Sequence, residues 1–151
     1  MRDHRFIAEH RGGPLKKEHQ RQLMEWACHC SQHVLPLYDE VTDERLIVAL
    51  EVAKAWQEGK ATVGQAMKAS VNAHAAAREA SSPVAVAVAR SVGQVVATAH
   101  MADHSMGAAW YALKAVKSAG KSAEEEREWQ NRKMPPEVAE MLLNARDLRR
   151  V

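Results

Sequence analysis

The apolar residues of this chain recur with the spacing of helices, and the alternating pattern of strands is nearly absent. Six apolar positions, spaced one, three or four residues apart, share one side of a helix: Leu23, Trp26, Ala27, Cys30, Val34 and Leu37. Pro14 suits the first position of this helix, where a missing N–H costs nothing, and Pro36 should end it. The pattern predicts a first helix with one buried side.

Start and stop signals divide the rest of the chain into six more helices. The N-cap candidates are Thr42 or Asp43, Thr62, Ser82, and Ser122. Thr62 with Gln65, and Ser122 with Glu125, have the spacing of capping boxes. Gly59 and Gly120 suit left-handed helix ends. The sequence MPPE begins the seventh helix. Connections of two to six residues predict neighbours that pack as antiparallel hairpins.

The apolar positions of these helices predict what is buried. The expected core residues are Leu46, Ile47, Leu50, Ala53 and, as a further candidate, Trp56; Met106, Trp110, Leu113 and Val116; and Val138, Met141, Leu142, Ala145 and Leu148. Valines at 84, 88, 92, 95 and 96, with alanines on the other faces, predict a central helix covered on most sides. We therefore expect an all-α, single-domain bundle of about seven helices over residues 1–151, with residues 1–13 irregular.

Composition and charge narrow the possible functions. The chain has 151 residues, of which 46% are hydrophobic and 26% charged, with a formal net charge of +2. This balance argues against disorder and against general attraction to nucleic acid, although both ends are mildly basic. There is no apolar run long enough for a membrane span, no secretory signal and no disulfide framework. We expect a cytoplasmic protein.

Histidines supply the candidate site chemistry. His100 and His104 lie four residues apart with Asp103 between them, which is the spacing of helical metal ligands, and His74 could converge on them. Asp103 could instead cap a new helix that starts at His104, and the two histidines would then lose their common face. His29 and His33 form a second pair with the same spacing. A hydrogen-bonded structural or recognition cluster is favoured over a bound metal.

Other reactive residues give no catalytic pattern. Cys28 and Cys30 point about 200° apart on a helix, so they cannot share a metal or form a disulfide. Cys30 lies on the buried side, which leaves Cys28 as the cysteine that could be exposed. The sequence has no GxSxG elbow, no P-loop and no GxGxxG motif, so we expect no enzyme activity and no cofactor. Trp129, among charged neighbours, is either a surface anchor for a partner or a staple for a short helix.

Four blocks of the sequence together resemble a known bacterial family. They are EWACHCSQHVLPLY, EVAKAWQEGKATVGQAMKASVNAHAAAREA, VARSVGQVVATAHMADHSMGAAWYALKAV and EEEREWQNRKMPP, and they resemble the putative immunity protein family of bacterial polymorphic toxin systems. The resemblance runs from about residue 20 to 138. It implies a small cytoplasmic all-α protein that binds and neutralises a cognate toxin by protein–protein interaction.

The resemblance also indicates which residues deserve attention. The positions that match the family pattern are Cys28, Cys30, His33, Trp56, Gly59, Gly64, His74, Arg78, His100, His104, Gly107, Trp129 and Gln130. From these and from the histidine spacing, the candidates for binding a partner or ligand are His33, His74, Arg78, His100, Asp103, His104 and Trp129. The chain departs from the family pattern at His29, where an acidic residue is more usual. It also lacks a proline–arginine turn around DERLIVAL.

Three interpretations follow from the sequence. The first is a non-catalytic immunity protein that occludes a toxin with a complementary surface. The alternative is a helical bundle that binds a metal or small ligand through His29 and His33, or through His74, His100 and His104. The third is a protein that binds nucleic acid through its basic ends. The alanine and valine faces of the helices would suit a homodimer seam as well as a monomer core.

Overall fold

The computed structural model describes residues 2–151, and within them it contains seven α-helices and no β-strand. The helices are α1 Lys17–Val34, α2 Glu44–Gln57, α3 Val63–Glu79, α4 Pro83–Ala97, α5 His104–Ser118, α6 Ala123–Arg132 and α7 Pro136–Arg149. Three short 3-10 helices accompany them, η1 His4–Phe6, η2 Glu9–Arg11 and η3 Leu35–Leu37. The all-α fold class expected from the sequence is confirmed.

Local capping chemistry sets the helix boundaries. The side chains of Asp43, Thr62, Ser82 and Ser122 each accept a hydrogen bond from a backbone N–H of the first helical turn. At α3 the reciprocal bond of Gln65 to the Thr62 N–H completes the capping box. Gly59 and Gly120 follow α2 and α5 with φ angles of 75° and 76°, which glycine adopts without strain. These predicted signals are confirmed, except that at α6 Ser122 caps the Glu125 N–H without the reciprocal side-chain bond of the predicted capping box.

The start of α1 was predicted three residues too early. Pro14 lies outside the helix, which begins at Lys17. The backbone of Leu15 pairs with the segment before it, because its N–H donates to the Ile7 carbonyl and its own carbonyl accepts from the Glu9 N–H. This pairing keeps the chain extended through Leu15 and delays the helix. Residues 2–13, expected to be irregular, contain η1 and η2 and bury Phe6; Met1 lies outside the described residues.

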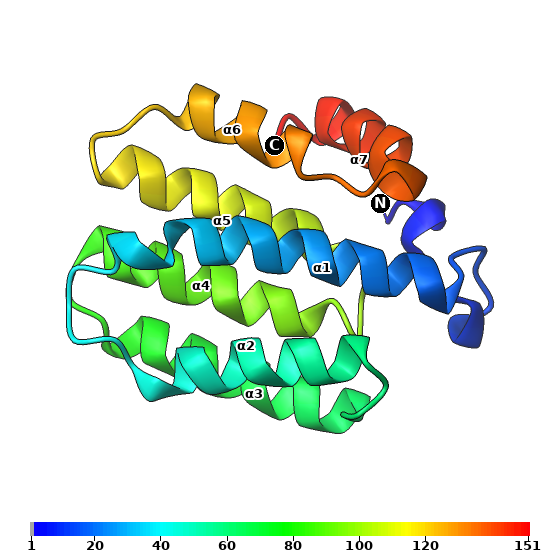
Figure 1. The fold of residues 1–151 in the computed structure, drawn as a ribbon, viewed down its shortest axis with the longest axis horizontal. Coiled ribbons are helices and arrows are strands. Elements are labelled where there is room, and N and C mark those ends of the chain that lie inside the picture. The colour runs from blue at the N-terminus through cyan, green and yellow to red at the C-terminus, as the bar shows by residue number, and fades with distance from the viewer. Residues whose placement is uncertain (1) are drawn as a thin grey trace.

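The helices form a row with a cover on one side. Helix α4 lies between α3 and α5, and α1 and α2 pack across this row from one side (Figure 1). Helix α6 contacts α5 and α1, and α7 contacts α1, so both lie beyond the α5 edge of the row (Figure 1). Two hydrophobic clusters fill the bundle: one contains Trp26 and Leu142, the other Trp56 and Val92. The cover leaves the opposite side of the row facing outward.

Three large apolar residues predicted to be buried are exposed instead. Trp110 is 40% exposed, Ile47 38% and Leu148 72%, whereas Trp26 is fully buried as predicted. In α5 the buried positions belong largely to small residues, among them Ala108, Ala109, Ala112 and Ala115. Small side chains let α5 approach α4 and α1 closely, and this leaves Trp110 on the outer side. None of the described helices has the length and apolar content needed to cross a membrane.

A candidate binding face on the third, fourth and fifth helices

The outer side of the row is marked by the few residues of α4 that are not buried. Within this helix of valines and alanines, Val86, Arg90 and Gln94 remain partly exposed at intervals of four residues. This interval puts them on one stripe, away from α1 and α2. We call the surface around this stripe the α3–α4–α5 face, and define it by His74, Arg78, Arg90, Gln94, His104, Trp110 and Lys114.

His74 connects α3 to the exposed stripe of α4. Nη1 of Arg90 lies 2.8 Å from Nδ1 of His74, and because arginine can only donate, Nδ1 accepts this hydrogen bond. The proton of the neutral ring is then on Nε2. The ring lies against Gly93, where an added Cβ would come within 2.6 Å of Nε2. Burial, reinforced by Arg90 and Arg78, lowers the pKa of His74 below 6.5, so the ring is neutral at pH 7.

His104 connects α5 to the same stripe in a similar way. Its Nδ1 lies 2.6 Å from Oε1 of Gln94, so the ring donates a proton to the amide oxygen. Gly107 makes room for this contact, because an added Cβ would lie 2.8 Å from that oxygen. Burial lowers the pKa of His104, against a smaller opposite effect of Asp103. Two neutral histidines thus join the three helices through side chains of α4.

The aromatic part of the face lies on α5. Trp110 contacts Tyr111 edge to face, with ring centroids 4.8 Å apart, and Nζ of Lys114 lies 5.3 Å from the Trp110 ring centroid. Tyr111 and Lys114 also line a cavity of about 390 Å³ with Val86 of α4. His104, Gly107 and Trp110 line another of about 280 Å³. The polar contacts of α4 and the aromatic residues of α5, of which Trp110 is exposed and Tyr111 partly buried, therefore form one continuous surface.

His100 and Asp103 lie at the end of the row, in the connection between α4 and α5. Since α4 ends at Ala97 and α5 begins at His104, His100 and His104 do not share a helical face. Nη2 of Arg11 lies 3.2 Å from Nδ1 of His100, and burial together with Arg11 lowers the pKa of this histidine. Asp103 occupies the N-cap position of α5 but makes no capping hydrogen bond.

The carboxylate of Asp103 forms ion pairs with both ends of the chain. One oxygen lies 3.3 Å from Nη2 of Arg2 and the other 3.9 Å from Nη2 of Arg149. Asp103 and His100 thus hold the N-terminal segment and α7 against the α4–α5 connection. Their side chains are engaged within the protein.

His33 and Trp129 lie on a different part of the molecule, where α6 packs against the end of α1. Their rings stack with centroids 3.5 Å apart and planes 6° apart. Nδ1 of His33 also lies 2.6 Å from Oε2 of the buried Glu126. Trp129 and Glu126 together hold α6 on α1 through His33, although a cavity of about 450 Å³ remains beside them.

The histidines do not assemble into a metal centre. Among residues 2–151, no three His, Cys, Asp or Glu side chains gather closely enough to hold a metal ion. His74 and His100 each contact an arginine, whose charge disfavours a second cation beside the ring. His29 lies 3.9 Å from Glu25 on its own helix, while His33 binds Glu126 of α6. Within each of the two histidine groups, His29 with His33 and His74 with His100 and His104, every histidine therefore contacts a different side chain.

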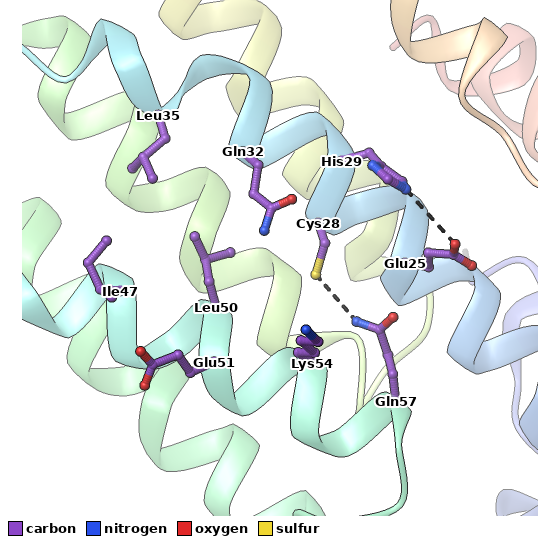
Figure 2. Close-up of a pocket in the computed structure, with 10 residues that line it drawn as sticks. All are labelled: Glu25, Cys28, His29, Gln32, Leu35, Ile47, Leu50, Glu51, Lys54 and Gln57. Atoms are coloured by element: carbon purple, nitrogen blue, oxygen red, sulfur yellow. Dashed lines mark hydrogen bonds and ion pairs between the residues drawn. The ribbon is translucent and has the colours of Figure 1, made fainter.

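A cavity of about 550 Å³ lies between α1 and α2 (Figure 2). Leu35, Ile47 and Leu50 line it, and the Sγ of Cys28 accepts a hydrogen bond of 3.4 Å from Nε2 of Gln57 (Figure 2). Cys28, predicted as the cysteine that could be exposed, is only 8% exposed, because α2 covers that side of α1. Burial raises the pKa of the Cys28 thiol to about 12. A thiol that stays protonated at pH 7 is a poor nucleophile.

The sequence named His74 and His104 as candidates, but not Arg90 and Gln94, which bind them in the structure. Arg90 and Gln94 carried a usable signal, since they are the charged and amide side chains of an otherwise apolar helix and lie four residues apart. Trp110 was assigned to the core from its apolar character. Which side of α5 is covered depends on tertiary packing and could not be read from spacing alone.

Comparisons with known proteins identify one family. A sequence model described as "Imm-5 like putative immunity protein" matches residues 13–137 of the chain. No curated protein and no solved structure shows a significant match. The matched range includes the whole of α1–α6 and therefore every residue of the α3–α4–α5 face.

Proposed function

We propose, from the premise that this chain belongs to the Imm-5 like putative immunity protein family, that it binds a cognate toxin protein and neutralises it by occlusion. In this proposal the complex forms in the cytoplasm of the cell that makes both proteins, and the immunity protein catalyses no reaction. The family match supports the toxin as the class of partner. The contact surface is argued from the structure.

The α3–α4–α5 face is the proposed contact surface. The observation that carries this choice is the exposure of Trp110 beside Tyr111 and Lys114, on the side of the row opposite α1 and α2. Tryptophan, tyrosine and arginine are the side chains that most often dominate binding energy at protein interfaces. Two cavities, one lined by Trp110 and the other by Tyr111 and Lys114, can receive side chains of a partner. By contrast, Trp129 is committed to its stack with His33.

The polar contacts beneath the face favour binding without rearrangement. His74 and His104 are fixed by hydrogen bonds to Arg90 and Gln94 of the central helix. A surface whose side chains are already held in place loses less conformational entropy when it binds. Low flexibility of this kind suits a protein that must bind its partner tightly as soon as both are made.

A non-catalytic mode of action agrees with the chemistry of the described side chains. Cys28 and Cys30 are buried, and burial raises the pKa of both thiols. The histidines of the face bind an arginine and a glutamine, so neither contacts a carboxylate that would orient it as a general base. Neutralisation by steric occlusion requires none of these groups to react.

A protection assay tests the proposed function. Each reading frame that neighbours this gene is expressed alone in a sensitive host, with and without this protein. The proposal predicts that one frame stops growth and that co-expression restores it. Trp110→Ala should weaken the rescue while the folded protein persists, whereas Trp129→Ala should act mainly through stability. If no neighbouring frame is toxic, or if a toxic one is not neutralised, the proposal fails.

A further inference from the structure

Charge is distributed unevenly over the helices. Helices α3, α4 and α5 contain five basic residues, Lys68, Arg78, Arg90, Lys114 and Lys117, against one acidic residue, Glu79, which gives these helices a net formal charge of +4. The whole chain carries +2, so the remainder carries −2. Positive charge is therefore concentrated on the row of helices that carries the candidate face.

The single carboxylate of these helices is already neutralised. Oε2 of Glu79 lies 2.8 Å from Nη1 of Arg45, which belongs to α2. Arg78, Arg90 and Lys114 take part in none of the ion pairs within residues 2–151. These three cations are consequently available to carboxylates from outside the molecule.

Two of the cations are held in defined positions. Arg90 is partly buried, and one N–H of its guanidinium donates a hydrogen bond to the neutral His74. A neutral ring does not cancel the charge of Arg90. The remaining N–H groups of its guanidinium can still receive a carboxylate. Lys114 is placed by its contact with the Trp110 ring. The face thus combines an exposed aromatic anchor on α5 with cations on α4 and α5.

From this arrangement we infer that the α3–α4–α5 face recognises a carboxylate-rich protein surface, with Trp110 of α5 as its apolar anchor. The inference rests on the proposed function, in which that acidic surface belongs to the toxin. Complementary charge would accelerate encounter and fix the orientation of the two proteins. The exposed apolar residues Val71 and Trp110 favour a protein partner over nucleic acid, and the small net charge of the chain points the same way.

The first arm of the test uses the toxin found by the protection assay. The variant R78E/K114E reverses two exposed cations of the face, and K54E/K60E makes the same charge change on α2 and the turn after it. We expect R78E/K114E to lower the association rate constant roughly tenfold or more at low salt, and K54E/K60E to change it little. Added salt should reduce the difference between the association rate constants of the two variants. If wild-type protein rescues growth but both variants associate equally fast, the inference is overturned and the proposed function stands.

The second arm needs no toxin and uses poly-L-glutamate as the acidic probe. Binding of the probe is followed by the fluorescence of Trp110, which is obtained as the difference between wild-type protein and the Trp110→Phe variant. Wild-type protein and K54E/K60E should bind the probe weakly and in a salt-dependent way, and R78E/K114E should lose at least tenfold in affinity. Equal binding by both variants would overturn the inference. So would tighter binding of a single-stranded oligonucleotide than of poly-L-glutamate at 150 mM salt, which would assign the face to nucleic acid.

Discussion

Substitution of Gly93 by alanine tests the contact on which the candidate face is built. Gly93 is buried in α4, and its Cα faces the His74 ring of α3. An added Cβ would lie 2.6 Å, 2.8 Å and 2.9 Å from three ring atoms, which is closer than nonbonded atoms approach. The ring cannot simply swing away, because its Nδ1 is bound to Arg90. Either α3 and α4 separate or the hydrogen bond breaks.

The expected magnitude combines two opposite effects. Overpacking of a buried site costs about 1–3 kcal/mol. Replacement of glycine by alanine within a helix gains up to about 1 kcal/mol. We therefore expect Gly93→Ala to lower the free energy of unfolding by about 1–2 kcal/mol. For a domain of this size, that corresponds to a decrease in Tm of about 2–8 °C.

A double-mutant cycle with His74→Ala isolates the contact. Without the imidazole ring, the added methyl group has room, and only the helix-forming advantage of alanine remains. Gly93→Ala should then stabilise the protein by up to about 1 kcal/mol, which gives a coupling free energy of about 1–3 kcal/mol between the two positions. Urea denaturation of the four proteins measures this coupling directly.

Gly64→Ala is the matched control. Gly64 also lies in a helix, but its added Cβ would meet Thr62 Oγ1 at 3.8 Å, an ordinary contact. This variant should be as stable as the wild type or slightly more stable. Equal effects of Gly93→Ala with and without His74 would refute the close approach of α3 and α4 described above.

Three further predictions concern buried or titrating groups. Arg146, only 1% exposed, donates to Gln130 and Asn131, so Arg146→Met should cost about 2–4 kcal/mol in urea denaturation, whereas the exposed Arg150→Met should cost little. Burial lowers the pKa of His74 and His104 below 6.5, so below that pH the unfolded chain binds more protons than the folded one. The free energy of unfolding should therefore fall as pH drops from 7 to 5, and an equal fall in H74Q/H104Q would contradict this assignment. Cys28, with its pKa raised to about 12, should resist aromatic disulfide reagents at pH 8 until the protein unfolds, and rapid reaction of folded protein would show that α2 does not cover it.

Much of the fold was predictable because it depends on short-range chemistry. Thr62 with Gln65, and Ser82 before Pro83, fix helix starts through contacts that lie within four residues. The break before His104 was foreseen as one of two alternatives for the same reason. The start of α1 was predicted wrongly because it depends on backbone pairing between Leu15 and residues 7–9, which the helical spacing does not encode.

The candidate face was harder to predict because it depends on which side of each helix is covered. Alanines of α5 face the core, and Trp110 faces outward, against the usual ranking of side chains by hydrophobicity. Arg90 and Gln94 gain their roles only when α3 and α5 lie on either side of α4. The spacing of His100 and His104 suggested a shared site on one helix, but the loop between α4 and α5 places His100 outside the helix that contains His104.

Stoichiometric, non-catalytic binding is the proposed way in which the protein neutralises a toxin. The most direct measurement is a titration of the toxin's activity with purified protein, followed by intact mass analysis of the toxin. Our account predicts that activity falls linearly to an end point near one equivalent and that the mass of the toxin is unchanged. Complete inhibition at a small fraction of an equivalent, or a changed toxin mass, would contradict it and indicate an enzyme.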